Sequence, residues 1–198
     1  MSGTPGQAAL AEIAFCEQVL AKGGATVLTE TLRGVGQPES WTSYPEGEVF
    51  DPQSGAQWFY HSHHPAADEA EHGHFHCFVR PDGADGPIHH LCAVGVDPHG
   101  RLVRLFTVNQ WVVGDDWLAA EPTVSLLPRF DVHMPQPNYL VNRWLTAVVA
   151  AHEPTIAGLI RARDAAIARH APDADGDARA SRALEVTAEH RFTDASAR

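Results

Sequence analysis

Residues 47–113 alternate short β-type segments with turn sequences, and this pattern limits the chain to an antiparallel sheet. The segments EVFD, AQWFYHSHH, HFHCFVR, IHHLCAVGV and RLVRLFTVNQWVV are rich in aromatic and β-branched residues, which favour strands. The sequences between them, PQSG, PDGADGP and DPHG, are typical of turns. Short strands joined in order by short turns predict an antiparallel meander, either open or curled into a barrel-like form.

Helical patterns flank this region on both sides. Residues 7–22 place apolar side chains at helical spacing and end at two glycines, which predicts an N-terminal helix. Residues 138–170 predict a long C-terminal helical region, with Asn138 as its cap and a kink at Pro154.

The C-terminal segment, residues 171–198, combines a polar loop with RALEVTAEHRF, which is compatible with a strand or a short helix. Length and patterning together predict one α+β domain over residues 1–198, with helices packed on the antiparallel sheet.

Charge, hydropathy and cysteine content indicate which partners and which cellular compartment to expect. The net charge of −11 repels phosphate backbones, and no basic stripe is visible, so we expect no nucleic-acid partner. No apolar run is long enough to cross a bilayer, and no secretory signal is visible, so we expect no membrane partner. Cys16, Cys77 and Cys92 are odd in number and widely spaced, which indicates reduced thiols in a cytoplasmic protein.

Residues 60–79, YHSHHPAADEAEHGHFHCFV, place six histidines within twenty positions. Because side chains alternate across a strand, residues two apart share a face. A hairpin that closes symmetrically would set His61 opposite His76 and His63 opposite His74, with all four on one face. Opposed side chains approach closely enough to share an ion. The spacing therefore predicts a metal site on this hairpin, whose opposite face is apolar.

Carboxylates from two places are candidates to complete the ligand set. Glu71 lies in the hairpin loop nearest the second strand. The preceding hairpin, turning at PQSG, would place Glu48 opposite Phe59 and Glu46 opposite His61, on the face that carries the histidines. The ligand set we expect is thus three or four histidines, with or without a glutamate.

Three further residues are candidates for the site. His89 and His90 are adjacent, so only one of them can join the histidine face, and the apolar partners of His90 favour His89 as a ligand. Arg80 and Arg104 are candidates to bind an anionic substrate beside the metal, and Glu71 is the candidate general base.

The leading hypothesis is a metal-dependent enzyme that acts on a small molecule. Two histidines with a carboxylate favour non-haem iron, three histidines with water favour zinc, and nitrogen-rich planar sets favour copper. We expect redox chemistry at iron or copper ahead of zinc hydrolysis, because Glu71 is the one base in view. GxSxG, P-loop, GxGxxG and HExxH motifs are absent from the sequence.

Several alternatives stay open at this point. The cluster is compatible with metal storage or sensing without catalysis, and with haem ligation through one histidine. It is also compatible with a histidine-rich, pH-responsive surface that binds no metal. A homodimer is compatible with the sequence as well.

The sequence resembles known families in two places. GAQWFYHSHHPAADE resembles the first cupin motif, with Gly55 before His61 and His63 and the acidic Glu69 after them, but Val103 stands where the second cupin motif has a histidine. The segments YPEGEVFD, EHGHFHCFVRP, RLFTVNQWVVGDDW, VNRWLTAVV and RALEVTAEH look like those of an uncharacterised family of bacterial proteins. That resemblance implies a bacterial cytoplasmic origin and assigns no activity.

Overall fold

A six-stranded antiparallel sheet forms the centre of the computed structural model, which describes residues 5–62, 70–170 and 176–192. Each strand pairs with the next one along the chain, so β1 and β6 form the two edges and the sheet is open rather than closed into a barrel. The predicted α+β class and meander are confirmed. The strands are β1 (Tyr44–Phe50), β2 (Ala56–His61), β3 (Gly73–Val79), β4 (His89–Val96), β5 (Leu102–Val108) and β6 (Val186–Arg191).

Both predicted helical regions are present, and the C-terminal one is two helices. Asn138 caps the first of them by accepting a hydrogen bond from the backbone N–H of Leu140, and Pro154 lies in the first turn of the second. Proline suits that position because it has no N–H to leave unpaired. The helices are α1 (Pro5–Lys22), α2 (Val27–Thr31), α3 (Gln110–Val113), α4 (Ala120–Leu126), α5 (Tyr139–Ala151) and α6 (Glu153–Arg169). No helix within the described ranges is both long enough and apolar enough to cross a membrane.

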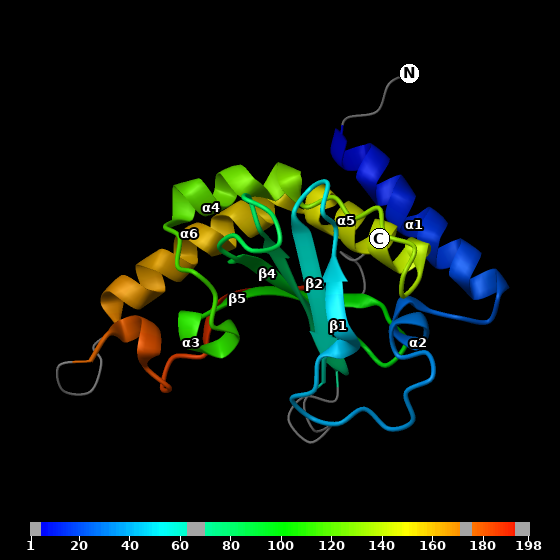
Figure 1. The fold of residues 1–198 in the computed structure, drawn as a ribbon, viewed down its shortest axis with the longest axis horizontal. Helices are drawn as coiled ribbons and strands as arrows, with labels where there is room; N and C mark the ends of the chain where they lie inside the picture. The colour runs from blue at the N-terminus through cyan, green and yellow to red at the C-terminus, as the bar shows by residue number, and fades with distance from the viewer. Residues whose placement is uncertain (1–4, 63–69, 171–175, 193–198) are drawn as a thin grey trace.

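The main core lies between one face of the sheet and the helices that cover it. In Figure 1, α4, α5 and α6 form an arc along one side of the sheet, with α1 beyond α5. Trp58, Tyr60 and Phe75 from the sheet pack in one buried cluster with Trp144 of α5 and Ile156 of α6. Burying these large side chains stabilises the fold, since each aromatic ring removes roughly 150–250 Å² of surface from water, on the order of several kcal/mol per ring.

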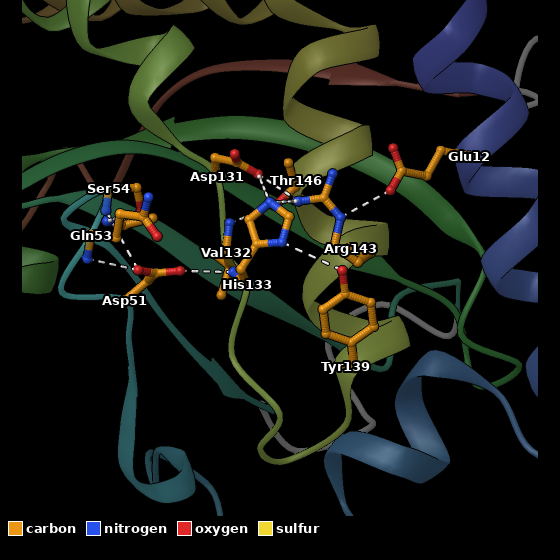
Figure 2. A network of polar contacts seen from close by, with 11 residues as sticks. Glu12, Asp51, Gln53, Ser54, Asp131, Val132, His133, Tyr139, Arg143 and Thr146 are labelled. Carbon is orange, nitrogen blue, oxygen red and sulfur yellow. Dashed lines mark hydrogen bonds and ion pairs between the residues drawn. The ribbon is translucent and has the colours of Figure 1, made fainter.

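A polar network ties the loop before α5 to the sheet, and Figure 2 shows its members. The buried carboxylate of Asp51 accepts hydrogen bonds from the backbone N–H groups of Gln53 (2.8 Å) and His133 (2.7 Å). On α5, Thr146 accepts a hydrogen bond from the N–H of Val132 at 2.9 Å, and Arg143 pairs with acidic groups on both sides. These contacts fix α5 against the hairpin of β1 and β2.

Strands β3 and β4 are buried along their whole length, although only one of their faces is apolar. The helices cover the face that carries Phe75 and Cys77. The other face carries histidines, together with a smaller apolar cluster of Ala93, Phe106 and Val108. Burial of polar rings on this second face requires partners for their nitrogens, and it makes this face the candidate site.

Candidate metal centre

The hairpin of β2 and β3 pairs with a register two residues away from the symmetric one. His61 lies opposite His74, and Phe59 lies opposite His76, instead of the expected pairs His61 with His76 and His63 with His74. His63 itself lies outside the described residues. The apolar pattern requires only that alternate residues stay on the same face, and a shift of two preserves that requirement where a shift of one would not. The predicted faces are therefore correct and the predicted partners are wrong.

Three buried imidazoles converge on this face. His61, His74 and His76 each offer a ring nitrogen, and these three atoms lie within 4.8 Å of one another. The Nε2 atoms of His61 and His74 are 2.7 Å apart, and the three ring centroids are separated by 4.5–5.0 Å. The set has the composition and the convergence of a metal-binding site.

The spacing fits a first-row transition ion after a small adjustment. Metal–nitrogen bonds of about 2.0–2.1 Å in a tetrahedral arrangement hold two ligand nitrogens roughly 3.3 Å apart. The nitrogens of His61 and His74 would have to separate by about half an ångström, and the nitrogen of His76, within 4.8 Å of both, would have to come to a similar spacing. Side-chain rotations can supply both changes. The residues present therefore fit such an ion.

Glu71 contacts His74 on the side of the ring that faces away from the cluster. Its Oε1 lies 2.9 Å from Nδ1 of His74, and its Oε2 lies 3.4 Å from Nη1 of Arg104. Burial would raise the pKa of Glu71, but the hydrogen bond and charge of His74 and the charge of Arg104 outweigh it and lower this pKa. The ionised carboxylate can only accept, so Nδ1 of His74 donates to it. A ring protonated at Nδ1 alone would present the lone pair of Nε2 to an ion.

A glycine on the neighbouring strand makes room for this carboxylate. Gly95 lies opposite His74 on β4, and a Cβ atom at Gly95 would come within 2.8 Å of Oε2 of Glu71. Such a contact is too close for a carbon and an oxygen to tolerate. The absence of a side chain at Gly95 is thus what lets Glu71 reach its partner.

The adjacent histidines of β4 take the opposite roles from those expected. The register between β3 and β4 shifts between Cys77 and Phe78, so that His90 lies opposite Phe78 on the site face. Nε2 of His90 is 3.1 Å from Nδ1 of His76, whereas Nδ1 of His89 is 2.6 Å from the backbone oxygen of Asp116. The expectation for His89 fails because a bulge inverts the alternation of side chains, and no sequence signal announced it.

The other three expected site residues lie apart from the histidine cluster. The register of β1 and β2 shifts between Tyr44 and Val49, so the expected pairing of Glu46 with His61 is lost and Glu46 is exposed. Glu48 accepts a hydrogen bond from the side chain of Gln57. Arg80 donates to the same Gln57 and to the backbone oxygen of Gly86.

A cavity of about 310 Å³ opens beside two of the three histidines. Aromatic rings flank both of them: Trp41 meets His61 edge-on with 6.1 Å between centroids, and Phe106 meets His74 at 4.9 Å. Trp41 was not predicted, because it lies in a Gly- and Pro-rich loop without periodicity. His61, Glu71, His74 and Arg104 line the cavity together with Trp41, His72, Gly73, Phe106, Val108, Val112, Glu185, Val186 and Arg191.

Comparison with known proteins places the chain in an uncharacterised family. Residues 7–192 match the family described as a domain of unknown function, DUF6969, and the chain belongs to that family. This agrees with the resemblance noted from the sequence. Neither a curated protein nor a solved structure matches the chain. Function is therefore inferred from the residues of the site.

Proposed function

We propose that the protein is a metal-dependent enzyme that holds one first-row transition ion through His61, His74 and His76. The observation that carries this proposal is the convergence of three buried ring nitrogens within 4.8 Å beside a cavity. Among the described residues three histidines offer ligands, which would leave coordination positions open on the ion, and a cavity next to His61 and His74 lets a small molecule reach them.

A three-histidine set by itself is typical of zinc, so our preference for redox chemistry at iron or copper rests on the state of the bases among the described residues. Hydrolysis benefits from a free base next to the attacking water. Glu71 is engaged by His74 and Arg104, and Nδ1 of His72 shares a hydrogen bond of 2.6 Å with the hydroxyl of Tyr60. In this proposal Glu71, restrained by Arg104, positions the metal ligand His74, and the ion provides the reactivity.

The same geometry argues against the other hypotheses. A histidine-rich surface would be exposed, whereas His61, His74 and His76 are buried. Haem is held by axial ligands above or below its ring, whereas three imidazoles directed at one point suit a single ion. A storage or sensing role requires a filled coordination shell, and the cavity beside two of the ligands favours an open one.

Elemental analysis of the protein purified without an affinity tag tests the proposal. We expect close to one equivalent of iron or copper per chain, reduced at least tenfold in His76→Ala. His99→Ala is the matched control, because His99 is an exposed turn residue far from the cluster in sequence. Full metal content in His76→Ala would contradict the proposed ligands, and one equivalent of zinc with no iron or copper would contradict the redox assignment.

A further inference from the structure

Strand pairing arranges the site face in two neighbouring rows. The first row runs across β2 to β6 and is polar: His61, His74, Gly95, Arg104 and Arg191. The second row runs beside it: Phe59, His76, Ala93, Phe106 and Glu189. The proposed ligands thus occupy the β2–β3 part of both rows, and the cavity extends from them toward β5 and β6.

Charges along the polar row neutralise one another. Arg104 lies between two carboxylates, with its Nη1 at 3.4 Å from Glu71 and its Nε at 2.7 Å from Glu189. Arg191 is also within 3.4 Å of Glu189. A charged substrate would have to compete with these ion pairs for Arg104, so this part of the cavity does not select an anion.

An apolar wall continues from the histidines along the rest of the cavity. Phe106, Val108, Val112 and Val186 line it, and the ring of Phe106 also contacts His74. Phe106 and Val108 belong to a buried apolar cluster against which Val112 and Val186 pack. A molecule bound at the ion would therefore extend along this wall, where apolar groups leave water.

We infer that the substrate is a compact, predominantly apolar molecule with one metal-coordinating end, and that its apolar body packs against Phe106, Val108, Val112 and Val186. This inference rests on the proposed metal site. It names the substrate class: the ion binds the polar end, and the valine wall selects the apolar remainder over a charged or polar one.

Chelating probes with different tails test this inference on the cobalt-substituted protein. Acetohydroxamate and hexanohydroxamate carry the same metal-binding group and differ by four methylenes, each worth up to about fourfold in affinity when fully buried. Binding is followed through the visible absorption of cobalt. We expect hexanohydroxamate to bind at least tenfold more tightly than acetohydroxamate.

Two substitutions on α3 locate the tail. Val112 and its neighbour Val113 both pack against the apolar cluster of Ala93, Phe106 and Val108. Val112 also lines the cavity, whereas Val113 does not. Val112→Asn should reduce the preference for hexanohydroxamate over acetohydroxamate to threefold or less. Val113→Asn should retain the preference.

The possible results separate the two proposals. If the protein takes up no cobalt, the metal site is wrong and the inference falls with it. If cobalt binds but both hydroxamates bind equally, the metal site stands and the apolar substrate class is wrong. If Val112→Asn keeps the tenfold preference, the assignment of the valine wall is overturned.

Discussion

Nδ1 of His74 donates a hydrogen bond of 2.9 Å to Glu71, and the Nε2 atom of the same ring faces His61. A carboxylate behind a histidine selects one tautomer, restrains the orientation of the ring and makes the exposed nitrogen a stronger ligand. Arg104 holds the second carboxylate oxygen, so the glutamate itself is restrained. The positions of these three side chains suggest experiments on metal affinity.

Glu71→Ala should weaken metal binding by about 10- to 100-fold, because His74 loses the group that sets its tautomer and orientation. Affinity is measured by competition with a chromophoric chelator. Glu71→Gln, which keeps a hydrogen-bond acceptor, should lose less metal affinity than Glu71→Ala. Glu185→Ala is the matched control, since Glu185 lines the cavity but is not one of the described residues that converge as candidate ligands. Equal affinities for wild type and Glu71→Ala would contradict this role.

Gly95→Ala should reproduce much of the effect of Glu71→Ala without removing any polar group. The added methyl would lie within 2.8 Å of Oε2 of Glu71 and 3.1 Å of Cβ of Arg104, so the carboxylate must move. The same chelator competition checks the result. In Gly158→Ala the new Cβ meets nothing within 4 Å, so its metal affinity should match wild type. An unchanged affinity in Gly95→Ala would show that Glu71 is free to shift without consequence.

His90→Phe should lower metal affinity through His76, whose Nδ1 would lose its partner at 3.1 Å. Burial and the nearby charge of Arg163 lower the pKa of His90 to about 3, so the ring is neutral and its removal deletes no charge. His90→Gln supplies an acceptor again and should restore part of the affinity. His89→Phe should bind metal as the wild type does, and a loss as large as that of His90→Phe would remove the distinction between the two residues.

Asp51→Ala should destabilise the fold by about 2 kcal/mol, because the N–H groups of Gln53 and His133 lose the buried carboxylate that accepts their hydrogen bonds. Chemical denaturation monitored by tryptophan fluorescence measures the free energy of unfolding. Asp82→Ala, at an exposed position, should change this free energy by less than about 0.5 kcal/mol. Similar values for the two variants would show that the network of Figure 2 adds little to stability.

Glu30 should make the protein sensitive to acid. Burial raises the pKa of this carboxyl, but hydrogen bonds from Arg33 and Asn138 and the charge of Arg33 bring it below its usual value of 4.5. A carboxyl whose pKa is lowered by folding adds stability above its unfolded pKa, and this contribution is lost as the pH falls through the folded value. Between about pH 5 and pH 3 the melting temperature of wild type should therefore fall more steeply than that of Glu30→Gln.

Thermal unfolding at a series of pH values measures this difference. Glu39→Gln, a substitution at an exposed glutamate, is the control and should follow the wild-type curve. Parallel curves for wild type and Glu30→Gln would show that the contact of Glu30 with Asn138, 2.7 Å long, contributes nothing that depends on pH.

Local patterning was sufficient for the first five strands, for the N-terminal helix and the C-terminal helical region, and for the two faces of the sheet. It left residues 186–191, which form β6, open between strand and helix, and it extended the fifth strand through residues 110–113, which form the helix α3. Alternation alone assigned Trp58 and Phe75 to the core and His61, His74 and His76 to the opposite face. That assignment depends on a period of two residues, which every strand carries in its own sequence.

Long-range packing was needed for everything that depends on which residues lie opposite each other. Three features of the sheet depend on how several strands and their turns pack together. They are the pairing of His61 with His74, the bulge that places His90 on the site face, and the register shift that separates Glu46 from His61. A shift of two residues or a single bulged residue leaves the local pattern almost unchanged, so the sequence contains no local signal for it. The composition of the histidine face is thus a property of each strand, whereas the identity of the contacts within it is a property of the assembled sheet.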